Sequence, residues 1–224
     1  AMDLLDYLGI ASFDNVSNYL NHKILNKKKE DADINKIYLW IKRCDKKIEK
    51  INIPEYSSSN LTLLLKELKI IRNKKFNEEE LTKLFNKQGI YLAIEEALND
   101  TKIRGCTMVK NNNPCIYITR YFKEKASFYF TLYHEIGHIK SDYNKLKNKI
   151  MVNNEETSEK EIDNFALNQM IPDNIWNKVK INTLEREKIC KDNNIPLCFL
   201  YSRLAYEGII SYKSKEYNSH KEVI

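Results

Sequence analysis

The stretch FYFTLYHEIGHIKSDY, residues 128–143, places two histidines four residues apart, with a glutamate directly after the first. On a helix, residues i and i+4 lie one above the other, so His134 and His138 point the same way. The spacing predicts a helix over residues 126–140, with the histidines on a polar face and another face in a core. The residues of that core face are Phe128, Leu132, Ile136 and Ile139.

The same turn matches the HExxH pattern of zinc enzymes. Two imidazoles at this spacing can share one Zn²⁺ at ~2.0–2.1 Å each. Glu135 lies beside the first histidine, where it can act as a general base on a water without ligating the metal. HExxH also arises by chance on solvated helices. The apolar opposite face, and the presence of two of the chain's four histidines in one turn, favour a metal site.

A catalytic zinc needs a third protein ligand, and the segment EKEIDNFA, residues 159–166, offers carboxylates. Glu159 and Asp163 share a helix face, so one can ligate while the other accepts the N–H of a ligand histidine. Glu161 competes for the ligand role. Ser158 and Glu161 also fit a capping box, which gives Glu161 a structural role, so Glu159 is the favoured ligand.

The composition indicates a globular protein without membrane segments. The 224 residues are 42% hydrophobic and 30% charged, with a net charge of +6. No stretch approaches the ~18 consecutive apolar residues of a membrane helix, and no signal-peptide layout opens the sequence, so we expect a cytoplasmic protein. Five cysteines without a CxxC pair predict free thiols in a reducing compartment. Lysines are mixed with acids, so no direct nucleic-acid binding by this chain is expected.

The pattern of elements predicts an α+β fold. Residues 1–88 read as helical throughout, and residues 89–224 begin with short runs rich in β-branched and aromatic residues. IRGCTMV and CIYITRYF, joined by KNNNP, predict a hairpin within a small antiparallel sheet. The HExxH helix follows, then a polar connection over residues 141–158 and further helices near the C-terminus.

These motifs together resemble the ImmA/IrrE family of HExxH metallopeptidases. FTLYHEIGHI (residues 130–139) is similar to the family's Phe-Thr-Leu run into HExxGH. EKEIDNFALNQMIP (residues 159–172) is similar to its E-x-E-A-D/N-x-F-A segment ending in proline. LFNKQGIYLAI and PLCFLYSRLAYEGII are similar to further family segments, so the resemblance covers most of the chain. The chain departs from the pattern at Ile162, where the family usually has alanine.

The resemblance implies a role for each matched residue. It implies zinc ligands at His134, His138 and Glu159, a catalytic glutamate at Glu135, and Asp163 as the hydrogen-bond partner of a ligand. It also implies a zincin-like metallopeptidase domain over residues 89–224, with the HExxH…E ligand set of gluzincins, after the helical N-terminal region 1–88.

Family members cleave or antagonise helix-turn-helix repressors in phages, mobile elements and stress responses. The resemblance thus implies a zinc-dependent endopeptidase that acts in transcription regulation, with such a repressor as substrate. No helix-turn-helix is evident here, so we expect that domain either outside this sequence or on a separate protein. The alternative is a regulatory or antitoxin-type module that binds metal or a ligand without proteolysis. The presence of Glu135, which a pure sensor does not need, favours the enzyme.

Two further expectations follow for an enzyme. The strand CIYITR, residues 115–120, is expected to form a sheet edge on which an extended substrate adds as another strand. Arg203, Tyr133 and Tyr143 are candidates for stabilising the oxyanion, although a packing or surface role is the stronger expectation for each.

Overall fold

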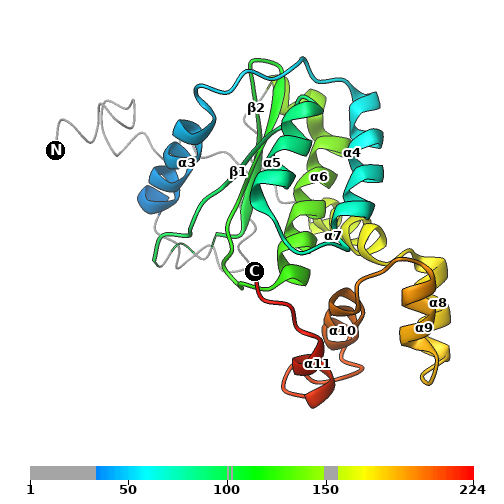
Figure 1. The fold of residues 1–224 in the computed structure, drawn as a ribbon. Helices are drawn as coiled ribbons and strands as arrows, with labels where there is room; N and C mark the ends of the chain where they lie inside the picture. Colours follow the sequence, from blue (N-terminus) through cyan, green and yellow to red (C-terminus); the bar gives the residue numbers. More distant parts are fainter. Residues whose placement is uncertain (1–33, 100, 102, 149–155) are drawn as a thin grey trace.

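The computed structural model describes residues 34–99, 101, 103–148 and 156–224. In these parts of the chain, helices precede and follow a small sheet (Figure 1), so the predicted α+β class is confirmed. The elements are α3 (Ile34–Ile48), α4 (Ser58–Ile71), α5 (Glu78–Lys87), β1 (Tyr91–Ile94), β2 (Gly105–Lys110), β3 (Asn113–Ile118), α6 (Lys125–Asn148), α7 (Glu156–Met170), α8 (Asp173–Ile181), α9 (Arg186–Asp192), α10 (Leu197–Tyr206) and α11 (Lys215–His220).

The predicted hairpin is present. Strands β2 and β3 are antiparallel, and Lys110 is opposite Asn113. The two turn residues, Asn111 and Asn112, have φ angles of 49° and 65°, the left-handed conformation that a tight hairpin requires and asparagine tolerates. Strand β1, however, pairs with β3 in parallel. The sheet is therefore mixed, and the prediction of an antiparallel sheet was wrong on this point.

Strand β3 lies in the middle of the sheet, whose order is β1-β3-β2. The prediction that this strand forms an edge was therefore wrong. The chain leaves β1, passes to the far side of the sheet to form β2, and returns through the hairpin to fill the space between them. Among the described residues β2 pairs only with β3, so β2 is the edge strand on the side of the hairpin.

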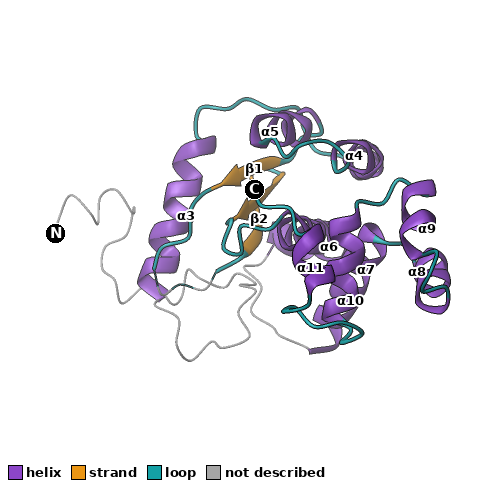
Figure 2. Cartoon of the chain, turned by 60° about the horizontal axis from the view of Figure 1, so that its bottom comes forward, coloured by secondary structure: helices purple, strands orange, loops and turns teal. Residues whose placement is uncertain are grey.

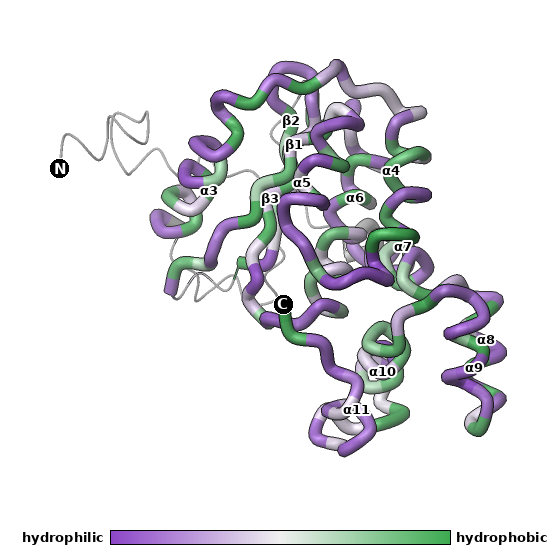
Figure 3. Tube along the Cα trace, viewed as in Figure 1, coloured by the Kyte–Doolittle hydropathy of each residue, from purple (hydrophilic) through white to green (hydrophobic). Residues whose placement is uncertain are grey.

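Helices cover both faces of the sheet (Figures 1 and 2). Helix α3 packs on one face, where Trp40 and Cys44 contact strand residues such as Cys106 and Tyr117. Helices α4, α5 and α6 share the larger core on the other face with strand residues such as Ile116. Hydrophobic and hydrophilic residues are mixed along α3 (Figure 3), and its buried residues recur every three to four positions, as expected of a helix with one buried face.

The described helices include none that is both long and apolar enough to span a membrane. All five cysteines are buried and have free thiols. Burial raises the pKa of Cys190 to about 11 and that of Cys115 to about 12. Thiolate is therefore scarce at neutral pH, and these side chains act as small hydrophobic residues.

The helices after the sheet differ in part from the prediction. Helix α6 continues to Asn148, so residues 141–148 are helical rather than part of the predicted polar connection, and residues 149–155 of that connection lie outside the described residues. Neither proline nor glycine interrupts this stretch, so nothing ends the helix at Lys140. Pro172, which follows α7, also precedes α8. The segments TLEREKICKDNN and PLCFLYSRLAYEG, residues 183–194 and 196–208, predict two of the helices near the C-terminus, and these are α9 and α10. The sequence did not predict α8 and α11. Gly208 follows α10 with a φ of 73°.

The described part of the N-terminal region is helical, as predicted, whereas residues 1–33 lie outside the described residues. Helix α4 begins at Ser58, and Ser57 is its N-cap. Gly89 follows α5 with a φ of 74°, and an added Cβ would lie 2.9 Å from the carbonyl oxygen of Pro54. Because α4 and α5 share a core with the sheet, the boundary at residue 88 stays a prediction.

Helices α6 and α7 approach closely at Gly137. A Cβ added there would lie 2.9 Å from Cγ2 of Ile162 and 3.1 Å from Cδ1 of Phe165. Ile162 is itself buried, so the larger side chain at this position fills the contact with α6. The residue that departs from the family pattern thus packs between the two helices.

This contact gives the first prediction. Gly137→Ala should lower the free energy of unfolding by ~1–3 kcal/mol, because the added methyl overlaps the stiff β-branched Ile162. In an Ile162→Ala background the same change should cost much less, since the overlapping methyl is gone. Urea unfolding of the two single variants and the double variant measures the coupling. Additive effects would show that the two residues do not compete for the same space.

Candidate metal centre

Three ligand atoms from two helices converge at one point. Nε2 of His134 lies 3.0 Å from Nε2 of His138 and 3.3 Å from Oε2 of Glu159. Nε2 of His138 lies 3.9 Å from the same carboxylate oxygen. Bonds of ~2.0–2.1 Å at tetrahedral angles place two ligand atoms roughly 3.3 Å apart, which is close to this spacing. Among the described residues, this is the one group of three or more such side chains with metal-ligand spacing.

Carboxylates on the far side of each imidazole set the histidine tautomers. Oδ1 of Asp163, on α7, lies 2.8 Å from Nδ1 of His134. Oδ2 of Asp142, one turn further along α6, lies 3.5 Å from Nδ1 of His138. A carboxylate accepts a hydrogen bond, so Nδ1 carries the proton when the imidazole is neutral, and Nε2 then presents a lone pair to the centre.

The convergence of these acceptors favours a cation. When both histidines are neutral, two Nε2 lone pairs and one carboxylate oxygen face one another in a mostly buried space. Burial by itself would lower the pKa of His134. The hydrogen bonds with Asp163 and Glu159 outweigh that effect and raise the pKa to about 9. The donor set therefore suits a positive charge at its centre, and two imidazoles with one carboxylate are ligands typical of Zn²⁺.

Glu135 is completely buried beside the histidines. Its Oε2 accepts a hydrogen bond of 2.6 Å from the hydroxyl of Thr107 on β2, whereas its Oε1 has no hydrogen-bond partner among the described residues. A Cβ added to Gly105 would lie 2.9 Å from that Oε1, so the absence of a side chain there makes room for the carboxylate. Burial raises the pKa of Glu135, and the neighbouring histidines act in the opposite direction.

The second helix brings Glu159, not Glu161, to the centre. Glu161 is exposed on α7, while the side chain of Glu159 is 28% exposed and reaches both imidazoles. The capping-box interpretation was wrong, because α7 begins at Glu156 and Ser158 therefore lies inside the helix. The sequence-based choice of Glu159 over Glu161 as the ligand agrees with the geometry. The capping role that was expected for Glu161 does not.

Two of the three candidate oxyanion donors bind other groups. The hydroxyl of Tyr143 donates to the carbonyl of Asn112 at 2.6 Å. Arg203 binds the carbonyl of Ile171 at 2.8 Å and the carboxylate of Glu207 at 3.1 Å. Tyr133 is packed in the main hydrophobic core, and its hydroxyl has no hydrogen-bond partner among the described residues. The oxyanion role of the three residues stays a prediction.

Sequence reasoning missed three residues of this centre. Asp142 lies four residues after His138, so the helical spacing could have identified it, but the predicted helix ended at Lys140. Thr107 and Gly105, two residues before it, come from a strand far away in sequence. No local spacing in the sequence signals that their strand faces Glu135.

Comparison of the chain with protein-family models, with curated proteins and with solved structures finds no match. The resemblance to the ImmA/IrrE family therefore stays a prediction from the sequence, and the proposal below rests on the geometry of the site.

The second prediction separates the two glutamates of α7. Glu159→Ala should abolish tight binding of the expected single Zn²⁺ per chain, because it removes one of three converging donors. His134→Ala and His138→Ala should do the same. Glu161→Ala, which removes an equal charge two residues away, is the matched control and should keep the metal. Metal analysis after gel filtration makes the comparison, and zinc retained by the Glu159 variant would refute this ligand set.

The third prediction concerns the carboxylates that hold the imidazoles. Asp163→Ala should keep the zinc but weaken its binding ~10–100-fold, because His134 loses the partner that fixes its tautomer. Asp142→Ala should act in the same direction on His138, with a smaller effect because its contact is longer. Competition with a chromophoric chelator measures both affinities. Wild-type affinity in the Asp163 variant would contradict the role given to this hydrogen bond.

Proposed function

We propose that this protein is a zinc-dependent endopeptidase. The observation that carries the proposal is the arrangement around one buried point: His134, His138 and Glu159 converge there, and Glu135 lies beside them without being one of the three donors. A site that only stored a metal would have no use for a further carboxylate held in place by a strand.

Zn²⁺ held by His134, His138 and Glu159 would supply Lewis acidity, which polarises a carbonyl and lowers the pKa of a water towards ~7. Asp163 and Asp142 keep the protons of the two imidazoles on Nδ1, so that both Nε2 atoms stay available as ligands.

Glu135 is the proposed general base. Thr107 holds one carboxylate oxygen, Oε2, which leaves Oε1 free to accept a proton from the attacking water. Burial raises the pKa of Glu135, and a carboxylate with a raised pKa is a stronger base, so it takes the proton of the water more readily. The protonated side chain then lies beside the leaving amine nitrogen, which as a free amine is basic enough to accept that proton. The same side chain then serves as base and as acid in the two halves of the reaction.

The substrate in this proposal is a peptide segment in extended form. Strand β2 is the sheet edge nearest to Glu135, so it replaces β3 as the strand on which such a segment would add. By the resemblance of its motifs, we propose a helix-turn-helix repressor as the protein that contributes the segment. Five free, buried thiols support a cytoplasmic location, where disulfides are rare.

The fourth prediction tests the base. Glu135→Gln should keep the fold and the zinc, because the amide has nearly the shape of the carboxylate and is not one of the converging donors. It should lower the rate of peptide cleavage by ~10²–10⁴-fold, because the amide cannot accept a proton at neutral pH. Mass spectrometry of a repressor digest, with zinc content measured on the same sample, gives both quantities. Glu161→Gln on the exposed face of α7 is the matched control and should cleave as wild type does.

The same pair of variants decides between the enzyme and the regulatory module. In a module that binds metal without proteolysis, Glu135→Gln leaves the transcriptional response of a target promoter unchanged. An unaltered response with zinc still bound would therefore remove proteolysis as the mechanism, while leaving the metal centre in place.

A further inference from the structure

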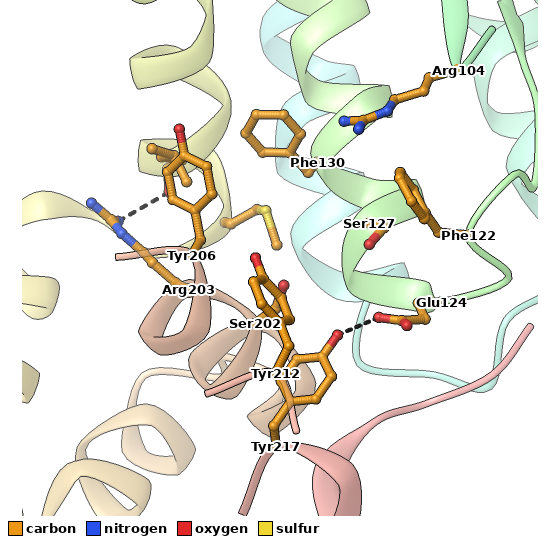
Figure 4. Close-up of a pocket in the computed structure, with 12 residues that line it drawn as sticks. Arg104, Phe122, Glu124, Ser127, Phe130, Ser202, Arg203, Tyr206, Tyr212 and Tyr217 are labelled. Carbon is orange, nitrogen blue, oxygen red and sulfur yellow. Dashed lines mark hydrogen bonds between the residues drawn. The ribbon is translucent and has the colours of Figure 1, made fainter. Parts of the chain in front are cut away.

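A cavity of about 400 Å³ adjoins the metal centre. Its walls come from the loop before β2, the start of α6, the end of α7 and the C-terminal helices (Figure 4). The ring of Phe130 lines this cavity and lies 6.2 Å, centroid to centroid, from the imidazole of His134. Leu167, one turn after Asp163 on α7, lines it as well. The cavity thus begins within one helical turn of the metal ligands.

Five of the twelve residues that line the cavity are aromatic, and its charged groups differ in how they are paired. Glu124 accepts a hydrogen bond of 2.5 Å from the hydroxyl of Tyr217 and pairs with Lys221 at 2.8 Å. Arg203 is held by backbone carbonyls and by Glu207. Both of these charges are therefore already satisfied by the protein itself.

Arg104 is the exception. Among the described residues no carboxylate oxygen lies within 4.0 Å of its guanidinium, which lies 4.5 Å from the ring centroid of Phe122. Figure 4 shows the guanidinium at the end of the cavity near Phe130 and Phe122, with Tyr206, Tyr212 and Tyr217 towards the other end. Burial lowers the pKa of Arg104, as expected for a charge that has lost water. The carboxylate of Asp163 acts on this charge in the opposite direction, but it makes no direct ion pair with it. A half-buried guanidinium that is stacked on an aromatic ring and has no carboxylate in direct contact is well placed to bind an anionic group.

The backbone places Arg104 close to the proposed chemistry. It directly precedes Gly105, the residue whose missing side chain makes room for the Glu135 carboxylate. The amide of Thr119 also binds the Arg104 carbonyl at 2.8 Å, which fixes the backbone at this point. A peptide that adds to β2 would therefore pass Arg104 as it passes Glu135.

We infer that this cavity is a specificity pocket that receives an acidic side chain, glutamate or aspartate, of the substrate peptide. The carboxylate pairs with the guanidinium of Arg104, and the methylene groups pack against Phe122 and Phe130. This inference rests on the proposed endopeptidase function and assigns that function a preference for an acidic residue near the cleaved bond.

Binding of defined peptide pools tests the pocket without relying on cleavage. Two pools of short synthetic peptides carry either glutamate or glutamine at the centre, with acidic residues excluded from the other, random positions. Immobilised, zinc-loaded Glu135→Gln protein is incubated with each pool, and mass spectrometry quantifies what is retained. The glutamate pool should be retained roughly 10–100-fold better, since a charge-assisted hydrogen bond distinguishes the two side chains.

Substitutions at Arg104 assign the preference to this residue. Arg104→Gln, combined with Glu135→Gln, should abolish the preference, and Arg104→Lys, which keeps the charge, should retain part of it. Arg104→Glu should reverse it in favour of a third pool with lysine at the centre. Arg43→Gln removes an exposed arginine on α3 and is the matched control that should leave the preference unchanged. Thermal unfolding establishes that each variant is folded.

Equal retention of the glutamate and glutamine pools, or a preference that survives Arg104→Gln, would overturn the inference. Cleavage of peptides by the wild-type protein without any acidic preference would support the endopeptidase function and contradict the proposed specificity pocket. Selective binding of the glutamate pool through Arg104, with no cleavage by the wild-type protein, would support the proposed pocket and contradict the endopeptidase function.

Discussion

The close approach of α7 to α6 at Gly137 is the contact on which the candidate centre depends. Glycine lets Ile162 reach the surface of α6, and this sets the position of α7 relative to the two histidines. Glu159 lies three residues before Ile162 and Asp163 one residue after it, so both carboxylates are placed by one packing contact. A bulkier residue at position 137 would push away the helix that supplies the third ligand and one of the hydrogen-bond partners.

That contact also brings several ionisable groups into a space with little water. Two histidines, Glu135 and Asp142 are buried, and an isolated charge there would carry a large desolvation penalty. Each buried group has a specific partner instead: a carboxylate for each imidazole and a hydroxyl for Glu135. The exception is Oε1 of Glu135. This oxygen lies beside the converging ligand atoms, which is the position that a general base acting on a water would need.

The sequence predicted what depends on local spacing. Three features follow from periods of 3.6 or 2 residues within short segments. They are the HExxH helix, the hairpin with its Asn-Asn turn, and the shared helix face of Glu159 and Asp163. It did not predict that β1 pairs in parallel with β3, or that β3 is central, because strand order depends on long-range contacts without a local signature. Asp142 was missed for a different reason: lysines and asparagines after Lys140 were interpreted as a connection, although such residues are equally common on an exposed helix face.

Strand β2 links the proposed general base, Glu135, to the proposed substrate-binding edge of the sheet. Through Thr107 it orients the carboxylate of Glu135, and through Gly105 it leaves room for the free oxygen of that group. The same strand offers the sheet edge for an extended peptide, and Arg104 stands at its beginning. A peptide that pairs with β2 would therefore be positioned by the same strand that holds Glu135. The register of the peptide along β2 would then decide which peptide bond lies at Glu135 and which side chain lies at Arg104. Such coupling makes specificity a matter of strand register rather than of a separate recognition domain, because a shift by one residue turns every side chain to the other face of the strand.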